Sequence, residues 1–438
     1  MIRRSSLRRA EANPVPSHPG LSGADIVVQN DRRRRVRLDR RIGSGGEAEV
    51  YQLRGRSKVL AKVYRAAPPT DYRAKLEWMM QHPPTLSRHP QHVAIAWPTD
   101  MLFDRTMTLM GFLMPRVEAG FPLITAFNPR RRAKALPRFD RRLAFQAAHN
   151  LSQILGDLHA GGYVVGDLNE SNVLVTENGR ISLIDTDSFQ VRIPTAGNVV
   201  TYRSLVGKPE YTPPELQGVN FRSVDRSYEH DRFALGVLIF QLLMEGNHPF
   251  SVRWQGRGDP PTLERAIREG MYPFAPTTQP IQVPPGAPGI ETLDAATADL
   301  FRQCFVTGRT RPDARPTGHA WASALAAAVK ALAKCRKGHR YAAHLMTCPY
   351  CHASQNRTRK RASSAPSGVG ARSGKAPPPF AGVSAPAPAS VLGARAAQRK
   401  SSPAPSLATK AATPDQKGIP IWLWVILGIT AILIMMYL

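Results

Sequence analysis

The sequence predicts an α+β fold with a small β-rich N-terminal lobe and a larger helical C-terminal lobe. Up to about Met114, short apolar runs alternate with glycine and turn residues, which is typical of antiparallel strands. From Asp140 onward, apolar residues recur at helical spacing over long segments. Directly after the first of these helices, two short apolar runs joined by a segment with Asn178-Gly179 indicate a β-hairpin.

The predicted hairpin joins residues 172–175 to residues 181–184. Asp167 and Asn172 lie at the start of the first run, and Asp185 directly follows the second. Because the runs pair antiparallel, the hairpin brings these three oxygen-bearing side chains to one end. Hard divalent cations such as Mg²⁺ prefer oxygen ligands of this kind. Taken alone, the stretch also fits a surface hairpin with polar turn residues.

A glycine-rich segment lies between the first two strand-like runs of the N-terminal lobe. Gly43, Gly45 and Gly46 allow a tight turn whose backbone N–H groups can approach a phosphate closely. Shortly after it, residues 59–64 form an apolar run that contains one lysine, Lys62. A flexible turn followed by a lysine on an exposed strand edge is the alternative interpretation.

A helix is expected over residues 71–81, because Pro83 and Pro84 would end it. Glu77 is the acid in this helix that is best placed to pair with Lys62. An ordinary solvated glutamate fits the same position.

The spacing from Asp167 to Asn172 and on to Asp185 resembles the catalytic and metal-binding loops of protein kinases. The resemblance implies a two-lobed protein-kinase-like fold over residues 36–332, with ATP and Mg²⁺ as cofactors. It implies that Asp167 accepts the proton of a substrate hydroxyl and that Asn172 and Asp185 bind Mg²⁺. Lys62 would hold the α- and β-phosphates of ATP.

The same resemblance implies an adenine pocket in the N-terminal lobe. Strand-like runs at residues 93–97 and 107–114 would complete the sheet, with Met114 at the back of the pocket. The expected ATP-binding residues are Ile42, Gly43, Ser44, Gly45, Gly46, Val50, Ala61, Lys62, Glu77, Met114 and Val117.

Three positions depart from the family's pattern. Gly166 replaces an arginine that pairs with an activation-loop phosphate in most protein kinases, and Asn169 replaces a lysine that contacts the γ-phosphate. The triplet Asp185-Thr186-Asp187 replaces Asp-Phe-Gly, so a switch that depends on the phenylalanine is not expected to work in the same way. We hypothesise that Lys208, in place of the usual threonine, restores an amine near Asp167.

Three residues of the C-terminal lobe match structural positions of the family. Glu215 ends a Pro-Pro-Glu segment, Asp231 opens an apolar helix at residues 231–243, and Arg315 lies in a closing motif. The resemblance implies that Asp231 holds the catalytic-loop backbone and that Arg315 pairs with Glu215. Small-molecule phosphotransferases share the core of the fold but lack these features, so protein substrates, with serine or threonine rather than tyrosine, are favoured.

A cysteine-rich segment at residues 333–355 predicts a small zinc knuckle. Cys335, His339, Cys348 and Cys351 offer four ligands of the kind that zinc takes in closed tetrahedral sites. His344 or His352 could replace the predicted histidine, and a redox pair of cysteines is an alternative. Cys304, in an apolar helix, is expected to be a core residue.

The ends of the chain carry most of its excess positive charge, since the whole sequence has a formal net charge of +27. Residues 1–41 hold eleven arginines against four acids, and residues 356–418 hold eleven Lys or Arg against one acid. This charge predicts attraction to an anionic membrane or acidic partners, whereas nucleic-acid binding is disfavoured because no recognition motif accompanies it. Residues 1–35 and the linker 356–418 are expected to be disordered or extended.

Residues 419–438 are uncharged and long enough to span one bilayer core, so they predict a C-terminal transmembrane helix. Together with an N-terminus that lacks an apolar leader segment, they predict a tail-anchored protein of the bacterial inner membrane whose main domain is cytoplasmic.

The altered loops and the knuckle together resemble a bacterial branch of serine/threonine-protein-kinase-like proteins. The resemblance implies protein substrates and association with a PP2C-type phosphatase and a von Willebrand-type protein. Three alternatives stay open: a pseudokinase scaffold that binds nucleotide or partners without turnover, a small-molecule kinase, and a kinase fold that regulates the knuckle and basic linker.

Overall fold

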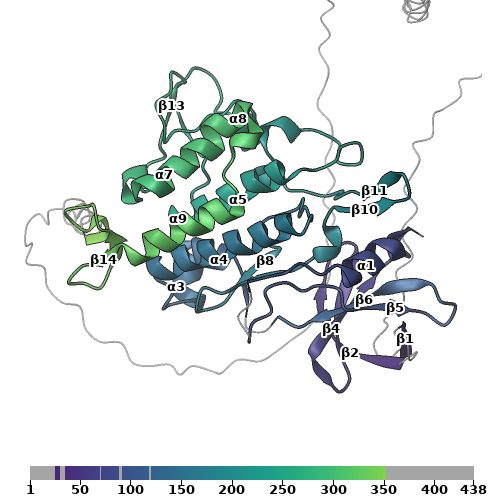
Figure 1. Cartoon of the computed structure of the whole chain (residues 1–438). Helices are drawn as coiled ribbons and strands as arrows, with labels where there is room; N and C mark the ends of the chain where they lie inside the picture. Colours follow the sequence, from purple (N-terminus) through teal and green to yellow (C-terminus); the bar gives the residue numbers. More distant parts are fainter. Residues whose placement is uncertain (1–24, 30–34, 70, 88–90, 118–119, 352–438) are drawn as a thin grey trace, which may run out of the picture. The chain divides into compact units, whose positions relative to one another are not determined.

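The computed structural model describes residues 25–29, 35–69, 71–87, 91–117 and 120–351. Its N-terminal part is a closed antiparallel barrel with strand order β1-β2-β3-β4-β6-β5 (Figure 1). The strands of this barrel are β1 (Asp25–Gln29), β2 (Arg35–Ser44), β3 (Ala48–Leu53), β4 (Arg56–Tyr64), β5 (Asp100–Phe103) and β6 (Leu109–Pro115).

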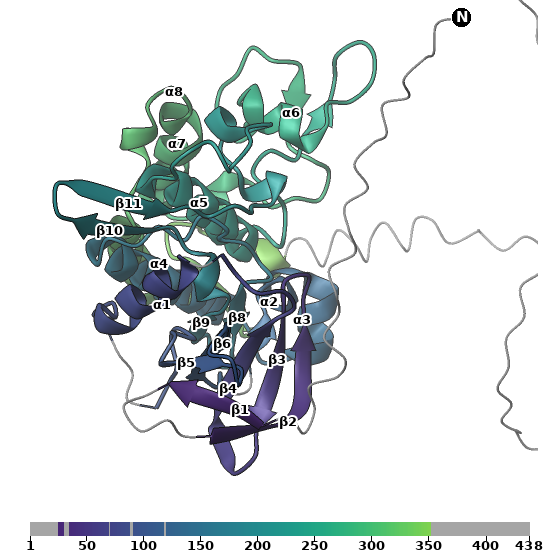
Figure 2. The same ribbon diagram turned by 90° about the vertical axis from the view of Figure 1, so that its right-hand side faces the viewer.

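The barrel separates two apolar clusters, because successive side chains of a strand point to opposite faces. Its interior is filled by Val36, Leu38, Tyr51, Leu53, Ala61, Val63, Leu102, Met110 and Leu113. Helix α1 (Tyr72–Gln81) lies between the barrel and the helical part of the protein (Figure 2). Its residue Leu76 packs among residues of β4 and β6 on the other face of the barrel wall. This second face is the one that turns toward the rest of the protein.

Two expectations about the N-terminal lobe are wrong. Residues 25–29, expected in a disordered tail, form β1, which pairs with both β2 and β5 and closes the barrel. Residues 93–97 form no strand of the barrel: Ile95 makes an isolated bridge to Leu183, and the Ala96 N–H donates to the Leu183 carbonyl at 2.9 Å. This apolar run instead attaches the N-terminal lobe to the predicted hairpin.

Three long helices form the centre of the C-terminal lobe: α4 (Arg141–Ala160), α5 (Tyr228–Leu243) and α9 (Gly318–Lys330). Both α5 and α9 pack against α4 (Figure 1). Helix α5 is apolar around most of its circumference, which is typical of a fully surrounded helix. It begins at Tyr228, before the expected start at Asp231. At the crossing of α4 and α9, a Cβ on Gly318 would lie 2.5 Å from the Gly156 nitrogen, so only glycine allows this approach.

The predicted hairpin is confirmed by β8 (Val173–Val175) and β9 (Ile181–Leu183), which pair antiparallel. The remaining strands are β7 (Phe121–Pro122), β10 (Val191–Thr195), β11 (Asn198–Tyr202), β12 (Arg253–Trp254), β13 (Ile281–Gln282), β14 (Leu332–Lys334) and β15 (Arg340–Ala342). The remaining helices are α2 (Ile124–Phe127), α3 (Pro129–Ala135), α6 (Leu263–Arg268), α7 (Ala295–Arg302) and α8 (Gly308–Thr310).

Within the part of the chain that the structure describes, no helix has both the length and the apolar character needed to cross a membrane. The predicted span at residues 419–438, the linker 356–418 and residues 1–24 lie outside the described residues. Cys304 is buried against the core, as expected from its apolar helix.

Candidate active site

Strand β4 directs Lys62 away from the barrel interior and toward the hairpin. Val50 on β3 pairs with Lys62, so its side chain lies on the same face. Leu60, two residues before the lysine, shares that face, whereas Ala61 is fully buried inside the barrel. The expectation that Ala61 contacts adenine is therefore wrong, and Leu60 takes the position.

The predicted back of the adenine pocket lies beside Leu60. Met114 pairs with Leu60 across β4 and β6, and it is 8% exposed. Val50 and Val117 pack against the same apolar cluster. These residues form an apolar wall next to Lys62, which suits the flat faces of a purine ring.

The glycine-rich segment forms the turn from β2 to β3. The Gly45 N–H donates to the Ala48 carbonyl at 2.9 Å, and Arg65 donates to the Gly45 carbonyl and to the Ser44 hydroxyl at 2.9 and 2.6 Å. A Cβ on Gly46 would meet no atom within 4 Å, so this end of the turn is open. Ile42 is 42% exposed, and Gly43 lies against Val50.

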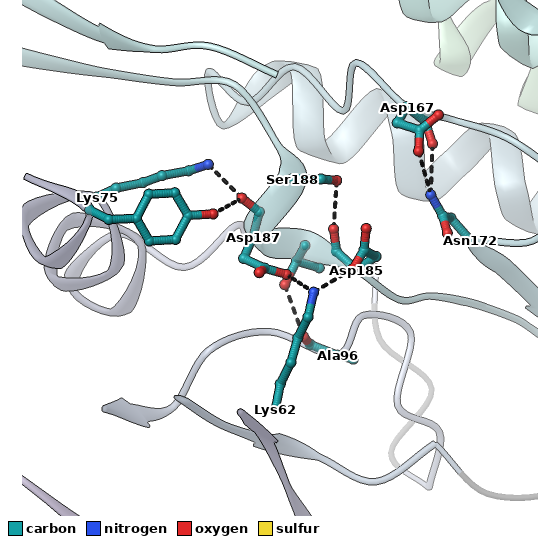
Figure 3. A network of polar contacts seen from close by, with 10 residues as sticks. Lys62, Lys75, Ala96, Asp167, Asn172, Asp185, Asp187 and Ser188 are labelled. Carbon is teal, nitrogen blue, oxygen red and sulfur yellow. Dashed lines mark hydrogen bonds and ion pairs between the residues drawn. The ribbon is translucent and has the colours of Figure 1, made fainter. Parts of the chain in front are cut away.

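Lys62 forms ion pairs with Asp185 and Asp187, both from the segment after β9 (Figure 3). Burial opposes the charge on Lys62, but the two carboxylates outweigh it and raise the pKa of Lys62 above its ordinary value. Asp185 has a left-handed backbone with φ of 64°, a conformation that aspartate tolerates better than most residues.

The predicted pair between Glu77 and Lys62 is not present. Glu77 lies on the outer face of α1 and binds Arg73 at 2.8 Å, with its side chain 40% exposed. Helical spacing places Tyr72, Lys75 and Leu76 on the opposite, inward face. Position in the helix therefore decides against Glu77, because residues that share the face of Tyr72 lie three, four or seven places from it, as Lys75, Leu76 and Met79 do.

Lys75 and Tyr72 bind Asp187, the third residue of the Asp185-Thr186-Asp187 triplet. Both the Lys75 amine and the Tyr72 hydroxyl donate to the Asp187 carbonyl at 2.5 Å (Figure 3). Lys75 is 1% exposed, and this burial lowers its pKa to about 8 despite the nearby Asp187 carboxylate. No sequence pattern pointed to Lys75, because a lysine on an amphipathic helix is ordinarily solvated.

Asp167 is held by two asparagines of its own loop. Asn172 donates to one carboxylate oxygen at 3.0 Å, and Asn169 donates to the other at 2.9 Å. Burial raises the pKa of Asp167, and the bonds from the asparagines act against that rise. Figure 3 places the Asp167–Asn172 pair across Asp185 from Lys62. The hairpin thus brings together the groups that the spacing predicted.

Asp231 holds the catalytic-loop backbone, as expected. Its carboxylate accepts from the Val165 and Gly166 N–H groups at 2.7 and 2.8 Å and contacts His159 at 3.1 Å. Gly166 has a φ of 74°, and a Cβ there would lie 2.4 Å from Ser204. The glycine that replaces the family's arginine is therefore required by both its backbone and its surroundings.

Arg226 links the catalytic loop to the segment that follows β11. Its guanidinium donates to the Gly166 carbonyl at 2.7 Å and to the Val206 carbonyl at 3.0 Å. The side chain also stacks on Phe221, with 3.7 Å to the ring centroid. It thus connects the two segments without a phosphate, near the position where the family's arginine is missing. Sequence reasoning missed this residue, because nothing in the local pattern marks it.

Lys208 binds the catalytic loop, although not at Asp167. Its amine donates to Glu170 and Ser171, both at 2.7 Å. Asn169 and Asn172 supply the bonds to Asp167 instead. The lysine therefore fastens the activation segment to the loop, and it lies near enough to Asp167 for its charge to act against the rise in the pKa of that carboxyl, while its hydrogen bonds go to Glu170 and Ser171.

The expected ion pair between Glu215 and Arg315 is present and bidentate, with distances of 2.7 and 2.8 Å. The Arg315 side chain is fully buried and also donates to the Glu229 carbonyl at 3.0 Å. It lies over the Phe233 ring, 5.5 Å from the centroid. The pair therefore anchors the activation segment to the core of the C-terminal lobe.

The four predicted zinc ligands converge beside β14 and β15, and their ligand atoms all lie within 4.8 Å of one another. The sulfurs of Cys335 and Cys351 are 3.8 Å apart, and the His339 Nδ1 lies 3.4–3.7 Å from the three sulfurs. Tetrahedral zinc, with bonds of about 2.3 Å to sulfur and about 2.0 Å to nitrogen, requires edges of about 3.5–3.8 Å. The donor set therefore fits zinc.

His344, the alternative ligand, contacts the Glu291 carbonyl at 3.0 Å, and His352 lies outside the described residues. The knuckle contacts the C-terminal lobe, where the Arg141 guanidinium lies 5.5 Å from the centroid of the Tyr350 ring. Four converging ligands favour a metal site over a redox pair of cysteines.

Comparison with known proteins gives a profile match to the protein kinase domain over residues 36–320. The chain is similar to Protein kinase YegI of Escherichia coli (strain K12), with 32% identity over 320 residues that cover 72% of this chain and 48% of that protein. It is 25% identical over 257 residues to Serine/threonine-protein kinase PknA of Mycobacterium tuberculosis (strain ATCC 25177 / H37Ra), covering 56% of this chain and 54% of that one. The chain spans about half the length of these relatives.

Among solved structures, the chain is similar to the ROP18 kinase domain in complex with AMP-PNP and sucrose, with a TM-score of 0.43 and 17% identity over 70% of this chain and 84% of that one. The profile match covers more than half of the sequence and includes strands β3 to β6 of the barrel and helices α4 and α5 of the C-terminal lobe. The chain therefore belongs to the protein kinase domain family.

Proposed function

We propose that this chain is a serine/threonine protein kinase that transfers the γ-phosphate of ATP to protein hydroxyl groups. The observation that carries the proposal is one site in which Lys62, Asp185 and the Asp167–Asn172 pair meet (Figure 3). Membership of the protein kinase domain family supports the use of ATP.

Each side chain at the site has a definite task in this reaction. Lys62 binds phosphate oxygens, and the apolar wall of Leu60 and Met114 takes the adenine. Asn172 and Asp185 supply oxygen donors that fit Mg²⁺, which neutralises phosphate charge when bound. Asp167 lies within the same loop and accepts the proton of the attacking hydroxyl.

Protein substrates are supported by the C-terminal lobe rather than by the site itself. The Glu215–Arg315 pair and Asp231 order the activation segment and the catalytic loop, which a small-molecule kinase does not need in this form. The choice of serine and threonine is supported by the similarity to PknA, whose name carries that specificity.

A pseudokinase scaffold is the second candidate function. It is favoured by two observations: Lys62 is engaged by two carboxylates, and Asn169 replaces the usual catalytic-loop lysine. The purified full chain, incubated with labelled ATP and Mg²⁺ beside Asp167→Ala and Asp185→Ala, decides between the two. Label on the protein or on a basic test substrate, lost in both variants, establishes a kinase. Binding of nucleotide with no transfer establishes the scaffold.

We propose that Cys335, His339, Cys348 and Cys351 hold one structural zinc ion, because four of the six distances between their ligand atoms are 3.4–3.8 Å and match tetrahedral edges. The purified protein is expected to contain about one zinc per chain, and Cys348→Ser to lose most of it, since structural sites need all four ligands. Metal analysis by mass spectrometry measures both. Cys304→Ser, which changes a buried cysteine outside the knuckle, is the control and should keep its zinc. An equal zinc content in wild type and Cys348→Ser would contradict the site.

We also propose that residues 419–438 tether the kinase domain to the bacterial inner membrane, with the domain on the cytoplasmic side. Support comes from twenty uncharged residues that follow a basic linker. A chain ending at residue 418 is expected to move from the membrane fraction to the soluble fraction of cells, and an unchanged distribution would contradict the tether. A PP2C-type phosphatase and a von Willebrand-type protein stay predicted partners, and their co-purification with the tethered chain is the measurement.

A further inference from the structure

The lysine that binds phosphate has two carboxylate partners with different surroundings. Asp185 has a side chain that is 36% exposed, and it is the residue expected to turn toward Mg²⁺. The Asp187 side chain is only 6% exposed and points at Lys62 from inside the protein. If Asp185 held a metal ion, Asp187 would be the carboxylate that stays with the lysine.

Helix α1 offers no acid to this lysine. Its inward residues are Tyr72, Lys75 and Leu76, and its glutamate, Glu77, faces solvent beside Arg73. The helix instead donates two hydrogen bonds, from the Tyr72 hydroxyl and the Lys75 amine, to the carbonyl of Asp187. These two hydrogen bonds therefore link the helix to Lys62 through Asp187.

We propose that Asp187 is the positioning residue for Lys62 and that Tyr72 and Lys75 hold Asp187 in place from α1. The expected arrangement, in which the helix supplies the carboxylate for Lys62, is thus reversed. Here the helix supplies hydrogen-bond donors, and the loop after β9 supplies the carboxylate. The proposal rests on the proposed ATP-dependent function. It assigns a role to the aspartate that replaces the glycine of the family's triplet.

Lys75 and Asp187 are buried and Lys62 is largely buried, which strengthens the contacts that join them. Lys75 is 1% exposed and Lys62 has a side chain that is 12% exposed, so their bonds to Asp187 are shielded from competing water. A lysine that is already held in position stabilises the negative charge of the phosphates without first having to reorient. Most of the catalytic effect of such a residue comes from this preorganisation. Without the Asp187 carboxylate, Lys62 would keep Asp185 as its ion-pair partner and would move whenever Asp185 moves.

Asp187→Asn in the full chain tests the role. We expect kcat/KM for ATP to fall about 100-fold, because a small misplacement of a catalytic group has effects of this size. Adding Asp187→Asn to Lys62→Met should cause no further loss, since both changes remove one function. Glu77→Gln, which removes the solvent-facing acid of α1, is the matched control and should stay within about twofold.

Three outcomes would overturn the proposal. An Asp187→Asn variant within twofold of wild type would show that the carboxylate does not position Lys62. A loss that adds fully to that of Lys62→Met would indicate a merely structural role. A raised Mg²⁺ requirement with unchanged ATP affinity would make Asp187 a metal ligand instead.

Two further measurements keep the test decisive. If Asp187→Asn fails to fold, Tyr72→Phe removes one donor to the Asp187 carbonyl, and about a tenfold loss is expected that vanishes in the Lys62→Met background. An additive or absent effect of Tyr72→Phe would contradict the link from α1 to Lys62 through Asp187.

If the wild-type chain transfers no phosphate, ATP affinity of the same variants replaces kcat/KM. Nucleotide binding that weakens equally in Asp187→Asn, Lys62→Met and the double variant supports the positioning role even where catalysis is absent.

Discussion

Replacing Asp167 with asparagine is expected to lower the rate of phosphoryl transfer about 1,000-fold while leaving nucleotide affinity nearly unchanged. In the proposed reaction the carboxylate accepts the proton of the attacking hydroxyl, whereas an amide of the same size cannot. Asp167 lies on the far side of Asp185 from Lys62, so the phosphate-binding groups stay in place (Figure 3). One bond, from Asn169 or Asn172, becomes a contact between two donors and is lost.

Single-turnover transfer from labelled ATP, with nucleotide binding measured in parallel, separates the two effects. Asp185→Ala, by contrast, should weaken Mg²⁺-dependent binding as well as transfer. Because burial raises the pKa of Asp167, the acid limb of the wild-type pH profile should lie above the ordinary range for aspartate. Activity should rise with pH through that limb, as the carboxylate loses its proton. Transfer by Asp167→Asn within tenfold of wild type would rule out the assigned role.

The largest loss of stability is expected for Glu215→Ala, which should lower the free energy of unfolding by about 3–5 kcal/mol. Removing the carboxylate leaves the guanidinium of Arg315 charged, fully buried and without its bidentate partner. The remaining bond to the Glu229 carbonyl and the contact with the Phe233 ring cannot replace two charge-assisted bonds.

Equilibrium unfolding in denaturant, at a fixed zinc concentration, measures this change. Asp313→Ala is the matched control, because it breaks the Arg311–Asp313 pair, whose side chains are 68% and 74% exposed. Its effect should stay within about 0.5 kcal/mol, as is usual for exposed pairs. If both variants lose the same stability, the pair between Glu215 and the buried Arg315 has no special role in the fold.

Local patterns were enough to predict much of the site. The spacing of Asp167, Asn172 and Asp185 around one hairpin predicted their convergence, because an antiparallel pair of short strands leaves its ends little freedom. The same holds for the zinc ligands, where Cys348 and Cys351 lie on one short turn. Alternation along β4 also contained enough information to choose Leu60 over Ala61, since neighbours in a strand face opposite ways.

Other contacts depended on which surfaces meet after the chain has packed. Lys62 finds Asp187 from 125 residues away, and α1 turns Lys75 rather than Glu77 toward that pair. Arg226 reaches Gly166 across 60 residues. Hydrophobic periodicity is a short-range property that places a residue on a face of its own helix or strand. The partner of a buried charge is set by desolvation, which acts only once distant faces have come together and excluded water.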